Sequence, residues 1–140
     1  MHNGCGEIDY GSLDSLGRPT GVSATLDNSM LHTGSSAKSS IRPPGFAGQS
    51  SGHARGHLLA KQLGGSGTDE RNLVTLFQNP VNTPIMRGFE NQIKKAIEAG
   101  EIIKYRVTPD YIGNSLIPDS IHMVAIGDRG FQLDVTIKNI

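Results

Sequence analysis

A histidine and an arginine separated by one glycine are the residues of this sequence best suited to chemistry. Arg55, Gly56 and His57 are consecutive. An imidazole exchanges protons near neutral pH, with an unperturbed pKa of about 6.5, and a guanidinium presents a planar fork of donors that suits phosphate oxygens. Because glycine permits a tight backbone turn, both side chains could face one cleft. The alternative is a surface loop with two ordinary polar residues.

Three asparagines and a glutamate form a second group of candidates. Asn72, Asn79 and Asn82 precede Glu90. An amide oxygen suits a hard cation such as Mg²⁺, which takes few protein ligands and keeps several waters. At about 1.5 Å of rise per helical residue, Glu90 would lie roughly 12 Å beyond Asn82, so it would act through water or by holding an arginine. The alternatives are a helix cap at Asn82 and a turn at Asn79.

The composition limits what these residues could serve. The chain has 140 residues, of which 13 are basic and 13 acidic, so the net charge is zero and a uniformly basic surface is excluded. The segment 55–106 still carries 8 basic and 5 acidic residues, which favours contact with a phosphate backbone. Cys5 is the one cysteine, so an intramolecular disulfide is excluded. We expect neither a transmembrane helix nor a signal peptide.

One long helix is predicted over residues 83–99. Thr83 can cap its start, and Pro84 suits the first helical position. Apolar residues at helical spacing form one stripe, namely Ile85, Met86, Phe89, Ile93, Ala96 and Ile97. Arg87, Lys94 and Lys95 lie on the polar side, and for Lys94 and Lys95 a solvated face is the simplest interpretation.

Strands are predicted on both sides of this helix. Alternating or continuous apolar residues indicate strands at 21–26, 72–77, 103–108, 121–126 and 131–137. Residues 56–63 could be a helical turn or the end of a strand. A chain that runs through strands, one long helix and then an antiparallel meander belongs to the α+β class. We expect one domain over 1–140, with a loop-rich lead-in over 1–50.

Several motifs together resemble one family. Ala54–Leu59 (ARGHLL), Asn72–Thr75 (NLVT), and Asn82 followed eight residues later by Glu90 are similar to the DNA/RNA non-specific endonucleases of the His-Me (ββα-metal) finger superfamily. The stretch from Leu58 to Tyr111 resembles the nuclease toxin domains at the C-termini of bacterial polymorphic toxins, and 13–21 resembles the lead-in to such domains. The resemblance implies a ββα-metal core over 51–100 and antiparallel strands over 101–140.

The resemblance also implies a role for each matching residue. His57 matches the general base, Arg55 the arginine that contacts the phosphate, and Asn82 the ligand of a single metal ion. Glu90 matches an acidic residue outside the first coordination shell, and Asn72 an asparagine that supports the site, so both are assigned to the catalytic group. Asn79 is the alternative ligand, and Arg87 joins Arg55 as a predicted substrate-binding residue. Where the family commonly has Asp, this chain has Ala54.

The implied activity is metal-dependent, sequence-nonspecific endonucleolytic cleavage. Mg²⁺ is the expected ion, with Mn²⁺ as another divalent candidate; DNA is the expected substrate, with RNA as a further one. The resemblance implies a domain that is secreted or delivered into a target bacterial cell as part of a larger toxin, and a cognate immunity protein. No membrane partner is expected.

Two other functions compete with this interpretation. One is a zinc site formed by His2, Cys5, His53 and His57, whose pairwise spacings zinc sites use, although Gly56 disfavours a helix that would align the last two. The other is a non-catalytic module for binding nucleic acid or a partner, in which His57 and Asn82 are structural.

Overall fold

The larger layer of the molecule is an antiparallel sheet of five strands in the order β1-β2-β5-β6-β7. The structure, a computed structural model, describes residues 7–140. The five strands are β1 (Ile8–Tyr10), β2 (Val22–Leu26), β5 (Ile103–Asp110), β6 (Ser120–Gly127) and β7 (Gln132–Lys138). The last three follow one another as a meander, and β2 from the lead-in pairs with β5 on the other side.

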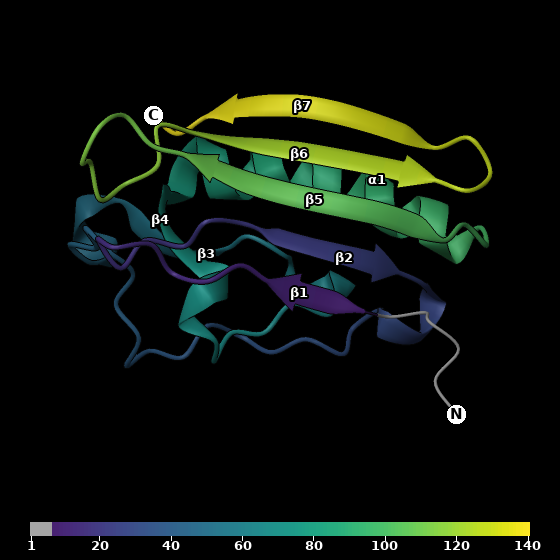
Figure 1. Ribbon diagram of the computed structural model, residues 1–140, viewed down its shortest axis with the longest axis horizontal. Helices are drawn as coiled ribbons and strands as arrows, with labels where there is room; N and C mark the ends of the chain where they lie inside the picture. Colours follow the sequence, from purple (N-terminus) through teal and green to yellow (C-terminus); the bar gives the residue numbers. More distant parts are fainter. Residues whose placement is uncertain (1–6) are drawn as a thin grey trace.

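One face of this sheet packs against the hydrophobic core. Along β5, Ile103, Tyr105 and Val107 are buried while Lys104 and Arg106 are exposed, because successive side chains of a strand point to opposite faces. The helix α1 (Arg87–Glu98) runs along the buried face, as Figure 1 shows, and contributes its apolar side to the same core cluster. The sheet thereby provides a rigid support for the helix.

A second sheet, of two strands, precedes the helix α1 in the sequence. It pairs β3 (His53–His57) with β4 (Leu73–Phe77) in antiparallel fashion. The chain then passes through an irregular segment, η5 (Gln78–Met86), whose backbone is extended at Asn79 and Thr83, and continues directly into α1. Two antiparallel strands followed by a helix make a ββα unit. Four short 3₁₀ helices complete the secondary structure: η1 (Asn28–Met30), η2 (Gln49–Ser51), η3 (Lys61–Leu63) and η4 (Glu70–Asn72).

The predicted strands are confirmed within two residues at their ends. Residues 56–63 combine both alternatives, since β3 ends at His57 and the short helix η3 follows. The strand β1 was not predicted, because three residues are too few to show an alternating pattern.

The predicted start of the long helix agrees with the backbone. Thr83 is extended (φ −142°, ψ 123°), as the residue that precedes a helix usually is, and Pro84 takes the first helical position. Within η5 only Asn79 and Thr83 depart from helical dihedral angles, so the helical backbone runs from Pro84 into α1. Ile85 is 36% exposed, whereas Met86, Ile93 and Ile97 are buried as expected. No helix within residues 7–140 is both long and apolar enough to cross a bilayer.

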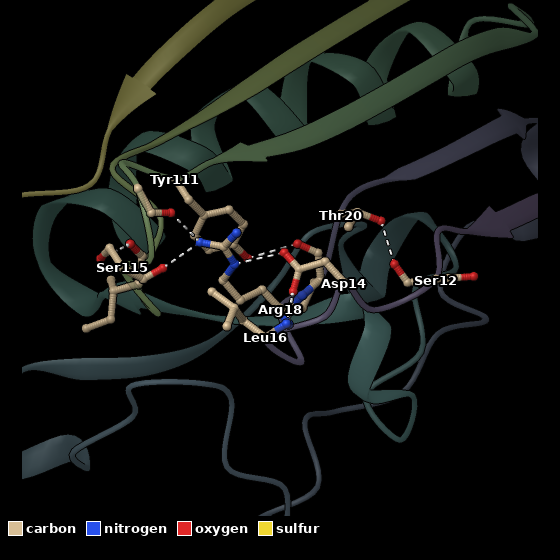
Figure 2. Close-up of polar contacts among 10 residues, drawn as sticks. Ser12, Asp14, Leu16, Arg18, Thr20, Tyr111 and Ser115 are labelled. Atoms are coloured by element: carbon tan, nitrogen blue, oxygen red, sulfur yellow. Dashed lines mark hydrogen bonds and ion pairs between the residues drawn. The ribbon is translucent and has the colours of Figure 1, made fainter.

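Arg18 fastens the lead-in to the loop that follows β5 (Figure 2). Its Nε donates to the Asp14 carboxylate at 2.8 Å, and its Nη1 donates to the carbonyls of Gly113 and Ser115 at 2.9 and 3.0 Å. The guanidinium carbon lies 4.4 Å from the centre of the Tyr111 ring. Hydrogen bonds from Arg18, the backbone N–H foremost, hold the pKa of Asp14 below its ordinary value. The lead-in is thus tied to the sheet through side chain and backbone.

Candidate active site

Strand β3 brings Arg55 and His57 to the same side. The two residues are two positions apart, and side chains at that spacing share a face of a strand. Gly56 faces the opposite way, where a Cβ would lie 2.3 Å from Leu76 Cδ1. Arg55 and His57 thus lie on one side, as expected, but the expected turn at Gly56 is absent. Gly56 lies within the regular strand β3, and its missing side chain leaves room for Leu76.

The His57 imidazole is oriented by a backbone carbonyl. Its Nε2 lies 2.8 Å from the Ser35 carbonyl oxygen, which can only accept, so Nε2 carries the proton and Nδ1 keeps its lone pair. Within residues 7–140, Nδ1 has no hydrogen-bond partner. Burial lowers the pKa of His57 below its ordinary value, and the positive charge of Lys61 acts in the same direction. The result is a neutral imidazole with one basic nitrogen available.

The Arg55 guanidinium is held in a similar way. Its Nε donates to the Ile41 carbonyl at 2.6 Å, and its Nη2 donates to the Ser39 carbonyl at 2.8 Å. Its remaining N–H groups are left for another acceptor. The loop 35–41 therefore orients both Arg55 and His57, in each case through backbone carbonyls.

Asn82 lies in η5 and presents its amide oxygen. Its Nδ2 donates to Gln78 Oε1 at 3.0 Å, and Oδ1 has no hydrogen-bond partner in the described part of the chain. Asn82 lines the cleft described below, whereas Asn79, the alternative ligand, is exposed and does not line it. The structure thus favours Asn82 over Asn79 as the candidate amide ligand.

Glu90 is a buried carboxyl group on the first turn of α1. Only 8% of the residue is exposed, and no group of residues 7–140 donates a hydrogen bond to it. Burial raises the pKa of Glu90 to about 8, although the nearby Arg87 charge opposes this shift. A buried carboxylate without a donor is costly unless a cation compensates it.

These residues meet in one cleft of about 520 Å³. It is lined by Arg55, His57, Asn82, Arg87 and Glu90, all predicted from the sequence, and also by His32, Ala60, Lys61, Gln62, Thr83 and Lys94. Four of its side chains are arginines or lysines, whereas Glu90 is its one carboxyl group. A cleft of this charge suits a polyanion even though the chain as a whole is neutral.

Three cationic or titratable lining residues were not predicted as part of the site. Lys94 was assigned to the solvated face of the helix, but it follows Glu90 by four residues, so both occupy the same helical face. That spacing was the available signal. His32 is exposed and lines the cleft, with a left-handed backbone (φ 63°). Lys61 reaches the cleft from η3, and its Nζ donates to Ser36 Oγ at 2.9 Å.

Asn72 does not line the cleft. It is fully buried, and its Oδ1 accepts from the Leu59 N–H at 2.8 Å while its Nδ2 donates to the carbonyls of Leu59 and Ser66 at 3.0 and 2.9 Å. These bonds fix the segment that follows His57. Its position fits the supporting role implied by the resemblance rather than contact with a substrate.

The zinc alternative is not favoured. The buried His53 accepts a hydrogen bond from the Ala47 N–H at Nδ1, and its ring packs edge-on against Phe77 with centroids 5.4 Å apart. Between residues 7 and 140, no three His, Cys, Asp or Glu side chains come together as a metal site. His2 and Cys5 lie outside the described residues. His53 is therefore explained as a core residue.

The ββα unit and its cleft define the class: this is the architecture of the ββα-metal nucleases. Residues 1–128 match the sequence model of the DNA/RNA non-specific endonuclease family, and the chain belongs to that family. It is accordingly a phosphodiester hydrolase that acts on nucleic acid. No curated protein sequence gives a significant match to it.

Solved structures share the fold at low sequence identity. NucA from Streptococcus agalactiae with magnesium bound superposes with a TM-score of 0.84 at 22% identity, over 99% of this chain and 74% of NucA. The Sda1 nuclease with a bound zinc ion gives 0.84 at 21% identity, over 96% of this chain and 74% of its own. A structure described as an extracellular endonuclease superposes with a TM-score of 0.73 at 22% sequence identity, over 99% of this chain and 80% of its own.

Proposed function

We propose that this nuclease hydrolyses DNA without sequence preference, with a single Mg²⁺ held by Asn82 and, through water, by Glu90, and with His57 as the general base. The observation that carries the proposal is the cleft itself. It combines a neutral imidazole, a free amide oxygen and a buried carboxyl group within reach of four cationic side chains. RNA is the further substrate that the family name includes.

The donor set fits a hard divalent cation. Amide and carboxyl oxygens are ligands that Mg²⁺ prefers, and a site with few protein ligands leaves it several waters. A cation beside Glu90 would compensate the buried carboxylate, which has no donor among the described residues. NucA was crystallised with magnesium and Sda1 with zinc, so related folds accept divalent ions. Mn²⁺ satisfies the same oxygen ligands.

His57 begins the reaction as a proton acceptor. Its Nδ1 takes a proton from the attacking water, whose oxygen forms a bond to phosphorus while the bond to the 3′ oxygen breaks and that oxygen is protonated from solvent. Ser35 holds Nε2, so the base keeps the tautomer that this step needs. When bound, a divalent cation supplies charge neutralisation for the phosphate and for the leaving oxygen.

The arginines bind the substrate phosphate. Arg55, restrained by two carbonyls, offers its remaining N–H groups to a phosphate oxygen, and Arg87 extends the positive surface along α1. The Asp that the family commonly places at position 54 is Ala54 here. Arg55 is nonetheless oriented, because Phe46 also stacks on it, with 4.5 Å between the guanidinium carbon and the ring centre.

We also propose that the nuclease is the toxic domain of a larger protein that is secreted or delivered into a target bacterial cell. The support is the resemblance of 58–111 to polymorphic-toxin nucleases. The producing cell would then need an immunity protein, and the cationic cleft would favour a partner that presents acidic side chains. Expression in a bacterial cytoplasm tests this: the wild type should arrest growth, and His57→Ala should not.

Digestion of supercoiled plasmid and of RNA tests the catalytic proposal. With Mg²⁺, the wild type should nick and then linearise plasmids of unrelated sequence, and EDTA should abolish cleavage. His57→Ala and Asn82→Ala should each lower the rate by at least about a hundredfold, because they remove the base and the ligand. Glu70→Ala, at an exposed position of η4 that does not line the cleft, is the control. Cleavage that persists unchanged in His57→Ala would overturn the mechanism.

A further inference from the structure

Two side-chain amides meet beside the cleft. Asn82 lines it, while Gln78, four residues earlier in η5, is exposed and does not. Asn82 Nδ2 donates to Gln78 Oε1 at 3.0 Å. This is the one hydrogen bond that the Asn82 side chain makes within residues 7–140.

The direction of this bond decides which end of the Asn82 amide is free. An amide has an oxygen that can ligate a cation and an NH₂ group that cannot. Because Gln78 accepts, the NH₂ group is occupied and Oδ1 is left over. In the reverse arrangement, Gln78 Nε2 would donate to Oδ1 and the NH₂ group would be left to face the cation.

Gln78 is well placed to act as a fixed acceptor. Its own backbone N–H donates to the Gly52 carbonyl at 2.9 Å, and the N–H of the preceding Phe77 donates to Asn139 Oδ1 at 3.0 Å. Asn139 is itself buried and bonded to the Thr75 carbonyl. The backbone beside the Gln78 side chain is therefore held by Gly52, which precedes β3, and by Asn139, which follows β7.

We infer that Gln78 is a positioning residue that turns the Asn82 amide so that its oxygen faces the cation, and that the hydrogen-bonding character of residue 78 sets the affinity for Mg²⁺. The inference rests on the proposed function, because it takes Asn82 as the ligand. An acceptor at position 78 is required, and a donor at that position is not.

Two substitutions at position 78 separate the effect of the hydrogen-bond acceptor from the effects of the donor and of side-chain length. Gln78→Met keeps the length of the side chain and removes the acceptor, and Gln78→Glu keeps an acceptor and removes the donor. Neither alters the core, because Gln78 is exposed. For Met we expect the Mg²⁺ concentration at half-maximal nicking to rise about tenfold, as for other residues that orient a metal ligand. Glu should need no more Mg²⁺ than the wild type.

A second readout is independent of cleavage. Mg²⁺ that binds the folded protein raises its melting temperature, so the rise can be titrated without nucleic acid. The midpoint of this titration should also move about tenfold for Gln78→Met and should not weaken for Gln78→Glu. Gln92→Met and Gln92→Glu, at an exposed position of α1 that does not line the cleft, make the same chemical changes and should leave both midpoints where they are.

The outcomes distinguish the inference from the proposed function. If Gln78→Met titrates like the wild type, or if Gln78→Glu loses as much Mg²⁺ affinity as Gln78→Met, Gln78 does not orient Asn82 and the inference is wrong, while Mg²⁺-dependent cleavage by the wild type stands. If the wild type neither cleaves with Mg²⁺ nor is stabilised by it, both the proposed function and the inference fail.

Discussion

His57 carries a basic nitrogen whose protonation is disfavoured by its surroundings. Burial and the Lys61 charge lower its pKa, so the imidazole stays neutral to a lower pH than a free histidine would. Since the neutral form is the base, kcat/KM should fall on the acid side with a midpoint below about 6.5. Rates on plasmid DNA from pH 4.5 to 8 at saturating Mg²⁺ measure this, and a midpoint above 7 would contradict it. In Lys61→Gln the midpoint should move upward.

Glu90 predicts a dependence of stability on pH in the metal-free protein. The unfolded chain ionises this group near 4.5, whereas the folded chain keeps it protonated up to about 8. Between these values the folded state binds more protons, so the free energy of unfolding falls as the pH rises.

Glu90→Gln removes this penalty. In EDTA it should stabilise the protein by roughly 4 kcal/mol at pH 8 and by almost nothing at pH 4. Urea denaturation at the two pH values measures the difference. Mg²⁺ should stabilise the wild type more than the variant, because the cation compensates a carboxylate that glutamine lacks. An equal effect of the substitution at both pH values would show that folding does not raise the pKa of Glu90.

At the scale of elements, the loop 35–41 depends on close packing against the segment that follows η3. The Gly67 N–H donates to Ser35 Oγ at 2.8 Å, and a Cβ on Gly67 would lie 2.0 Å from the Ser36 carbonyl oxygen. That neighbour is backbone, so the loop itself would have to move.

Gly67→Ala should therefore displace the carbonyls that orient His57 and Arg55. We expect kcat to fall about a hundredfold, the cost of a shift near 1 Å, with a smaller loss of stability. Gly88→Ala is the matched control, because nothing lies within 4 Å of its Cβ and it sits in α1. It should keep full activity and gain up to about 1 kcal/mol. Single-turnover cleavage and thermal melts separate the two effects.

The elements also show what the sequence could and could not predict. Alternation along β5 predicted which of its residues face inward, and the family motifs identified four residues that line the cleft, namely Arg55, His57, Asn82 and Glu90. Thr83 and Pro84 correctly marked the start of the long helix, because the backbone is extended at Thr83 and helical from Pro84. The orienting role of Ser35, Ser39 and Ile41 has no sequence signal, because it comes from their carbonyls.

For the whole molecule, the Arg18 contacts predict a stability that depends on the lead-in. Arg18→Met removes the side-chain hydrogen bonds to Asp14, Gly113 and Ser115, and should lower the melting temperature by roughly 5 °C. Arg129→Met, at an exposed turn, removes the same charge and should change it little. Both variants should cleave at the wild-type rate well below their melting temperatures. Equal melting temperatures for the two would show that the lead-in is not fastened by Arg18.

The net charge of the whole chain is zero, but four arginines and lysines line one cleft that has a single carboxyl group. The rest of the chain therefore carries a net negative charge. The cleft is thus a local region of positive potential in a chain whose net charge is zero. Near a polyanion the molecule would rotate before contact, so that encounters begin at the cleft. At a distance, where only the total charge is felt, the same protein is not attracted at all. Capture would thus be short-ranged and oriented, and a cut strand that drifts beyond a Debye length would not be drawn back.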